Sequence, residues 1–166
     1  MLSECRANSV AWHVNRGQQV LALNLIFTGD ASPDKIGDPK SLWGLATLYT
    51  ELLAAMGDRP LGIEVAQLLA ASKWFQTSKT SPSISLESPG IRSQVAALVA
   101  SALEPATFSN ILTREGMHSF GHLLDKPVAY QDAPDLFCLD LYKESDIEHL
   151  VALAEPTKVV QTAVIS

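Results

Sequence analysis

One five-residue stretch carries the residue types of a nucleophilic serine site. Residues 117–121 read Met-His-Ser-Phe-Gly, close to the Gly-x-Ser-x-Gly pattern in which a tight turn lifts a serine hydroxyl above a sheet. A serine nucleophile needs a histidine as general base and an acid that orients the histidine. Asp140 and His149 follow Ser119 in a suitable chain order, with Asp135 as an alternative acid. The pattern predicts acyl transfer through Ser119, as in the hydrolysis of a small ester.

The same stretch also fits a purely structural turn. Met117 stands where the pattern has its first glycine, and a side chain at this position crowds the turn. Only about 30 residues separate Ser119 from His149, roughly the length of one crossover unit. The alternative interpretation is that Ser119 is a structural serine between a strand and a helix.

Metal and cofactor chemistry is not indicated by the sequence. His118 and His122 are four residues apart, the spacing of two ligands on one helix face, but no third ligand stands near them. Neither a Gly-x-Gly-x-x-Gly nor a Walker pattern occurs. Cys5 and Cys138 lack the spacing of a zinc site and are expected to be buried small side chains. We therefore expect no cofactor and no bound metal.

Composition indicates a single domain over residues 1–166 with an apolar core. Hydrophobic residues make up 47% of the chain and charged residues 18%, so burial can offset the entropy lost on folding. The net charge of −6 argues against nucleic acid or an anionic membrane as partner, because both require a basic face. Residues 1–10 contain Glu4 and Arg6 and no apolar signal-peptide region, so we expect a cytoplasmic protein.

Strand-like apolar runs alternate with segments that have helical spacing. The predicted strands cover residues 20–27, 84–86, 107–113 and 159–165, and the predicted helices cover residues 5–15, 41–56, 61–75, 91–103, 117–124 and 146–154. Ser41 is the expected cap of the second helix, and Trp74 is expected to face the core from the third. The alternation is typical of crossovers on a parallel sheet. It predicts an α/β fold, a three-layer α/β/α sandwich with a mostly parallel sheet.

Four stretches carry a family resemblance. Residues 20–29 look like a buried strand that leads into a turn, and residues 61–75 look like the helix before a nucleophile strand. Residues 84–103 are similar to that strand, its elbow and the following helix, and residues 132–156, with Ala-Pro near their start, are similar to the approach to the next strand. In these stretches the chain resembles the central part of the α/β-hydrolase superfamily, in particular the acetyl-xylan-esterase-like group of large bacterial hydrolases.

The resemblance implies a hydrolase sheet that lacks some strands and has a degenerate elbow. It places the nucleophile position at Ile91, between Ser88 and Ser93, and isoleucine cannot attack a carbonyl. The histidine of such enzymes follows a strand that this chain does not reach. Two functions stay open. One is a carboxylic-ester hydrolase that uses Ser119, and the other is a non-catalytic hydrolase remnant that acts as an interaction or oligomerisation module.

The low charge and the predicted sheet both point to self-association. A partial hydrolase sheet leaves an apolar edge that must be paired or covered, and residues 20–27 carry no charge that would protect such an edge. We expect a homo-oligomer that buries either this edge or the helix of Trp43.

Overall fold

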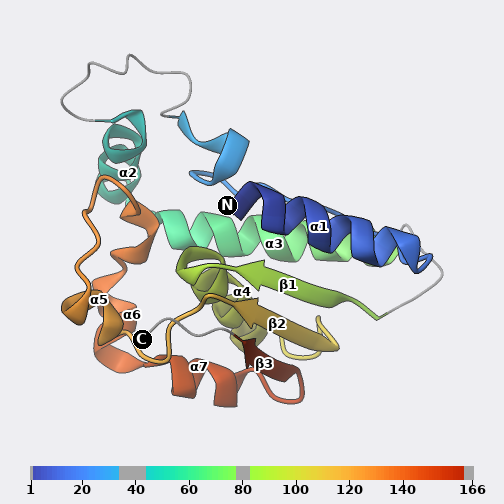
Figure 1. Ribbon diagram of the computed structural model, residues 1–166. Coiled ribbons are helices and arrows are strands. Elements are labelled where there is room, and N and C mark those ends of the chain that lie inside the picture. Colours follow the sequence, from blue (N-terminus) through green and yellow to red (C-terminus); the bar gives the residue numbers. More distant parts are fainter. Residues whose placement is uncertain (1, 34–43, 78–82, 163–166) are drawn as a thin grey trace.

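The computed structural model describes residues 2–33, 44–77 and 83–162. The helices and strands used below are α1 (Leu2–Asn15), α2 (Leu45–Ala55), α3 (Pro60–Thr77), β1 (Ser85–Pro89), α4 (Ile91–Leu103), β2 (Asn110–Arg114), α5 (His122–Asp125), η3 (Pro134–Leu136), α6 (Leu139–Glu144), α7 (Ile147–Leu153) and β3 (Lys158–Thr162), with a short 3-10 helix η1 (Gly29–Ala31) before α2. From β1 onward, strands and helices alternate (Figure 1). This alternation confirms the α/β class.

The three strands form one open, fully parallel sheet in the order β1-β2-β3. Leu86 of β1, Ile111 of β2 and Val159 of β3 are in register. They belong to the hydrophobic core around α4 or pack against it. Side chains on neighbouring strand positions point to the opposite face. There Glu87 of β1 bonds to His13 of α1, which runs along β1 in Figure 1.

The centre of the molecule is α4, which is apolar and buried around most of its circumference. Val95, Leu98 and Ala100 have no exposed surface. They pack between the sheet, α3 and α7, which all contact α4. Leu61, Val65 and Leu68 form the buried stripe of α3. Trp74 lies about 200° around the helix from Ser72 and is 60% exposed, so the prediction that it faces the core is wrong.

Residues 20–27 do not form the predicted buried strand. Val20, Leu21 and Leu23 are exposed, and the N–H of Ile26 donates to the side chain of Gln67 and not to a strand. The reason is tertiary, because an apolar run becomes a strand only where a free sheet edge lies beside it. The described part of the chain therefore holds three strands, one fewer than predicted.

The other predicted elements are found with shifted ends. The last predicted strand is observed as β3, and residues 163–165 lie outside the described residues, as do Ser41 and Trp43. Of the helices that the structure describes, none has the length and apolarity needed to cross a bilayer.

Candidate functional site

The elbow position suggested by the family resemblance has the expected strand-turn-helix backbone. β1 ends at Pro89, Gly90 adopts a left-handed φ of 86°, and α4 begins at Ile91. A residue with a Cβ rarely adopts such a φ, so glycine is required at this turn. The hydroxyl of Ser93 donates to the carbonyl of Pro89 at 2.5 Å, and Ser88 is buried. The turn residue is thus Gly90, Ile91 is the first residue of α4, and Ser88 and Ser93 lie to either side.

Ser119 lies in the loop that follows β2, and its hydroxyl is bound to a carboxylate. Ser119 Oγ donates to Asp146 Oδ2 at 2.6 Å, and the N–H of Gly121 donates to Ser119 Oγ at 3.0 Å. The other oxygen, Asp146 Oδ1, accepts the N–H groups of Phe120 and Ile147 at 2.7 and 2.6 Å. Asp146 is the N-cap of α7. Its carboxylate therefore joins the Ser119 loop to the start of this helix.

His149 completes the cap of α7 through its ring nitrogen. The backbone N–H of Asp146 donates to His149 Nδ1 at 3.1 Å, in a capping box. With Nδ1 as acceptor, the neutral ring carries its proton on Nε2. Nε2 lies 3.9 Å from Glu148, and the side chain of His149 is 61% exposed. No hydrogen bond joins Ser119 to His149 within the described residues.

The third predicted triad member lies apart from this cap. Asp140 is exposed in the first turn of α6, whereas Asp146 makes the contact with Ser119. The structure thus brings Ser119 and His149 to the same residue, but Ser119 bonds to the carboxylate of Asp146 and His149 to its backbone N–H. In a serine triad the imidazole lies between the serine and the acid.

The electrostatics of Asp146 suit a cap better than a catalytic base. Partial burial acts to raise the pKa of Asp146, but hydrogen bonds from Ser119 and from the N–H groups of Phe120 and Ile147 outweigh it, and the pKa is lowered. A carboxylate with a low pKa is ionised at neutral pH and is a weak general base. It accepts hydrogen bonds well and removes a serine proton poorly.

The predicted histidine pair does not form a metal site. His122 is the first residue of the four-residue helix α5, so His118 precedes the helix and does not share a face with it. Among the described residues, no group of three or more histidine, cysteine or acidic side chains is placed to hold a metal ion.

Two buried acidic residues and a partly exposed arginine form a cluster that sequence reasoning did not identify as a group. Arg92 of α4 binds Asp135 of η3 through two contacts, Nε to Oδ2 at 2.9 Å and Nη2 to Oδ1 at 2.5 Å. Arg92 also donates to the carbonyl of Phe27 at 2.9 Å. Beside this pair, Glu64 of α3 is 1% exposed. Through Arg92 the cluster ties the segment before η1 to α4 and η3.

Glu64 is held in its protonated form. Burial and the nearby carboxylate of Asp135 raise its pKa to about 9, against the opposing effect of Arg92. Its Oε1 has no hydrogen-bond partner within the described residues. The readable signal in the sequence was an acidic residue on the apolar stripe of a helix, since Glu64 lies between Leu61 and Val65. Asp135, the alternative acid of the predicted triad, is buried and paired with Arg92.

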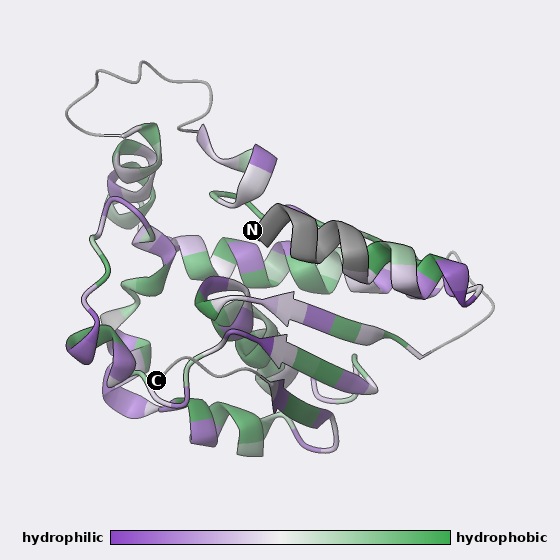
Figure 2. Ribbon diagram, viewed as in Figure 1, coloured by the Kyte–Doolittle hydropathy of each residue, from purple (hydrophilic) through white to green (hydrophobic). Residues whose placement is uncertain are grey.

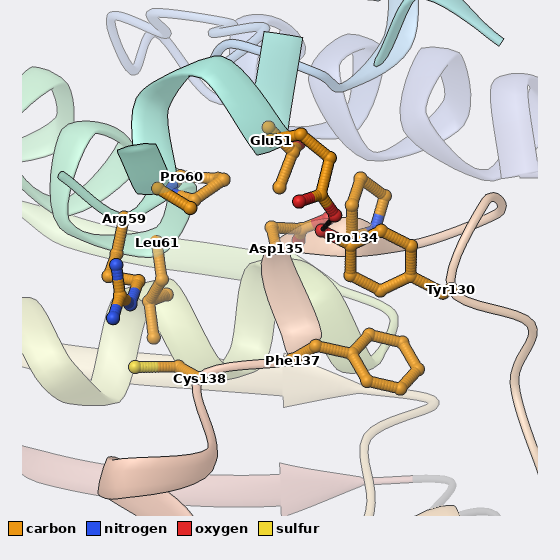
Figure 3. A pocket seen from close by; sticks show the side chains of 11 residues that line it. Glu51, Arg59, Pro60, Leu61, Tyr130, Pro134, Asp135, Phe137 and Cys138 are labelled. Carbon is orange, nitrogen blue, oxygen red and sulfur yellow. Dashed lines mark hydrogen bonds between the residues drawn. The ribbon is translucent and has the colours of Figure 1, made fainter. Parts of the chain in front are cut away.

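A small polar cavity opens between α2, the start of α3 and the loop before α6 (Figure 3). Its volume is about 220 Å³, below the usual range for a ligand of drug size. Tyr130 donates to Glu51 across its mouth at 2.9 Å, and burial together with this bond raises the tyrosine pKa to about 12. Arg59 and the half-buried Cys138 line the opposite wall. The cavity has room for one side chain or a few water molecules.

Figure 2 shows hydrophobic residues along the ribbons of α2 and of the coloured part of α1, and large apolar side chains in both regions are exposed. On α1 and the segment after it these are Trp12, Val14, Val20, Leu21 and Leu23, and on and just after α2 they are Leu48, Tyr49, Leu52 and Met56. Single exposed apolar residues are ordinary, but a contiguous group indicates a contact surface.

Comparisons with models of protein families, with curated proteins and with solved structures found no match for this chain. No activity can be inferred for it from a related protein. Its chemistry must therefore follow from its own side chains.

Proposed function

We propose that this chain is an α/β-hydrolase-like domain, acetyl-xylan-esterase-like in its layout, that acts as an interaction module and not as an esterase. The observation that carries the proposal is the bond from Ser119 to Asp146. Ser119, the only serine in an elbow-like sequence, donates its hydroxyl hydrogen bond to Asp146, the residue whose carboxylate caps α7. Without an imidazole on this hydroxyl, the serine remains a poor nucleophile.

The turn between β1 and α4 supports the same proposal. It has the backbone that would present a nucleophile at the carboxyl end of a parallel strand, where open α/β sheets bind their ligands. The residues at this position are Gly90 and Ile91, however, and neither has a nucleophilic side chain. The fold around this position is thus compatible with a hydrolase layout from which the nucleophile is missing.

Ester hydrolysis through Ser119 is the second candidate function. The observation in its favour is that Ser119 and His149 both bond to Asp146 and so lie at one place. A rotation of the exposed His149 ring toward Ser119 would give acyl transfer to a small ester a general base.

The test is intact-mass spectrometry after incubation with a fluorophosphonate, which labels activated serine nucleophiles. We expect no adduct on the wild-type chain at millimolar probe. A single adduct that is lost in Ser119→Ala and kept in the matched control Ser88→Ala would overturn the non-catalytic proposal in favour of the esterase. Denatured protein serves as the background for non-specific labelling.

A further inference from the structure

The helix α2 buries three small side chains and exposes several large apolar ones, while Leu45 and Leu53 are half-buried. Ala46, Thr47 and Thr50 are buried. On the other side, Leu48 and Leu52 are about half exposed, and Met56, which caps the helix, is 70% exposed. A helix on the surface of a monomer normally shows the reverse pattern. This arrangement leaves an uncharged apolar ridge facing solvent.

The inward face of α2 is fixed by contacts that a rotation of the helix would break. Tyr130, which lies outside the helix, donates to the carboxylate of Glu51 at 2.9 Å, and the buried hydroxyl of Thr50 is satisfied within the helix by the carbonyl of Ala46 at 2.8 Å. The helix also packs against η3. These contacts keep the apolar ridge on the outer side of the helix.

We infer that α2 forms the interface of a homodimer, in which Leu48, Leu52 and Met56 of two copies pack across a two-fold axis. The inference rests on the proposed function and names the partner of the interaction module. The three residues have the spacing i, i+4, i+8, so they form one ridge. Ridges of this type interdigitate with their own copies at a crossing angle of about −50°. A two-fold interface requires such a self-complementary patch.

The charge of the helix favours a second copy over other partners. Within α2 the only charged residue is Glu51, and it is bonded to Tyr130. A helix that binds at a membrane surface carries lysine or arginine on its polar face, and α2 has neither. The net charge of −6 further opposes anionic lipid and nucleic acid.

The size of the ridge predicts a weak dimer. Four half-exposed side chains, including Tyr49, offer roughly 400 Å² per copy, about half of what each partner contributes to a standard interface. We therefore expect a dissociation constant in the range of about 1–100 μM.

Sedimentation velocity on the full chain between 1 and 200 μM tests the inference. We expect a concentration-dependent shift from monomer to dimer for the wild type. In Leu52→Glu, and independently in Leu48→Glu, dimerisation should weaken at least tenfold, with unchanged circular dichroism. The matched control is Leu153→Glu on α7, a leucine that is 58% exposed at the opposite end of the molecule (Figure 1). This control should dimerise like the wild type.

Oxidative cross-linking gives the position of the contact. In a background with both native cysteines changed to serine, Leu52→Cys should form a disulfide-linked dimer and Leu153→Cys should not. A wild type that stays monomeric at 200 μM, or a dimer that Leu52→Glu leaves intact, would overturn the inference. So would a monomer that co-sediments with phosphatidylcholine vesicles through Leu52, because the ridge would then be a membrane contact.

The dimer and the proposed function can fail separately. A fluorophosphonate adduct on an intact dimer would remove the non-catalytic function and leave the interface. A monomer without an adduct would remove the interface and leave the non-catalytic function.

Discussion

Two helices of similar apolar character, α4 and α2, end in opposite environments. In α4, Val95, Leu98 and Ala100 are completely buried between the sheet, α3 and α7. In α2, Leu48 and Leu52 are half exposed, and small residues take the inner side. Apolar content alone therefore does not tell which helix forms the core. The layers that surround a helix decide this, and an apolar helix without a second layer is a candidate for contact with another molecule.

The largest expected effect is that of a leucine truncation in α4, compared with the same truncation in α2. Leu98→Ala should lower the free energy of unfolding by about 2–5 kcal/mol, because it leaves a cavity in a dry core. Leu52→Ala, measured well below the dissociation constant of the dimer so that the chain is monomeric, should change it by less than about 0.5 kcal/mol. Urea denaturation measures both values. Equal losses of unfolding free energy in the two variants would show that α2 is as deeply packed as α4, and would contradict the difference between the two helices.

A second prediction concerns the buried charge on the α3 side of this core. Glu64 has a folded-state pKa of about 9 against an ordinary value of 4.5. Between these values the folded state keeps a proton that the unfolded state releases, so wild-type stability should fall as the pH rises from 5 to 9. Glu64→Gln removes this dependence. At pH 8 it should be more stable than the wild type by about 1–3 kcal/mol, and at pH 5 nearly equal.

The control for this prediction is Glu104→Gln, at the exposed end of α4, which should change stability by less than about 0.5 kcal/mol at either pH. Urea titrations at pH 5 and pH 8 supply the comparison. A stability difference between Glu64→Gln and the wild type that is the same at both pH values would show that Glu64 is ionised in the folded state.

The cap of α7 should have an intermediate effect. Asp146→Ala should cost about 1–2 kcal/mol, since it removes the N-cap and the link to Ser119. The pKa of Asp146 is lowered in the folded state, so its contribution is present above the ordinary value of 3.8 and is lost as the pH falls through the folded value. Ser119→Ala should cost about 1 kcal/mol at pH 6. Unchanged stability of Ser119→Ala at pH 6 would argue against its structural role.

The smallest effect is expected at the outer surface between α3 and the end of α4. Lys73 pairs with Glu104 at 2.9 Å, and their side chains are 64% and 39% exposed. Lys73→Ala should cost no more than about 0.5 kcal/mol, and 0.5 M salt should remove the difference. A cost above 1 kcal/mol would mean that this surface is less solvated than its exposure indicates.

The local sequence pattern was sufficient to predict those helices and turns whose backbone conformation depends on nearby residues. The helical spacing of α3 and α4 and the turn at Gly90 are visible in the sequence, because backbone conformation there follows from nearby residues. The start of α7 was also predictable, since Asp146 is a good N-cap residue ahead of an apolar stretch. The prediction failed for residues 20–27, where a strand needs a partner edge that no local pattern can supply.

Predicting the candidate site required contacts between distant residues. The sequence marked Ser119 as unusual, but its partner Asp146 is 27 residues away, and no spacing rule connects them. Glu64, Arg92 and Asp135 meet only because α3, α4 and η3 converge. No local pattern predicts a buried charge cluster whose members come from three elements.

The sequence by itself determined the α/β class, the helices around the core and the absence of a nucleophile at position 91, since these depend on residue type and short-range spacing. The tertiary structure alone decided that Ser119 serves a cap, that Glu64 stays protonated and that α2 turns Leu48 and Leu52 outward. These three properties depend on which groups are brought within a few ångströms and which are left in water, and only the packed chain sets these distances.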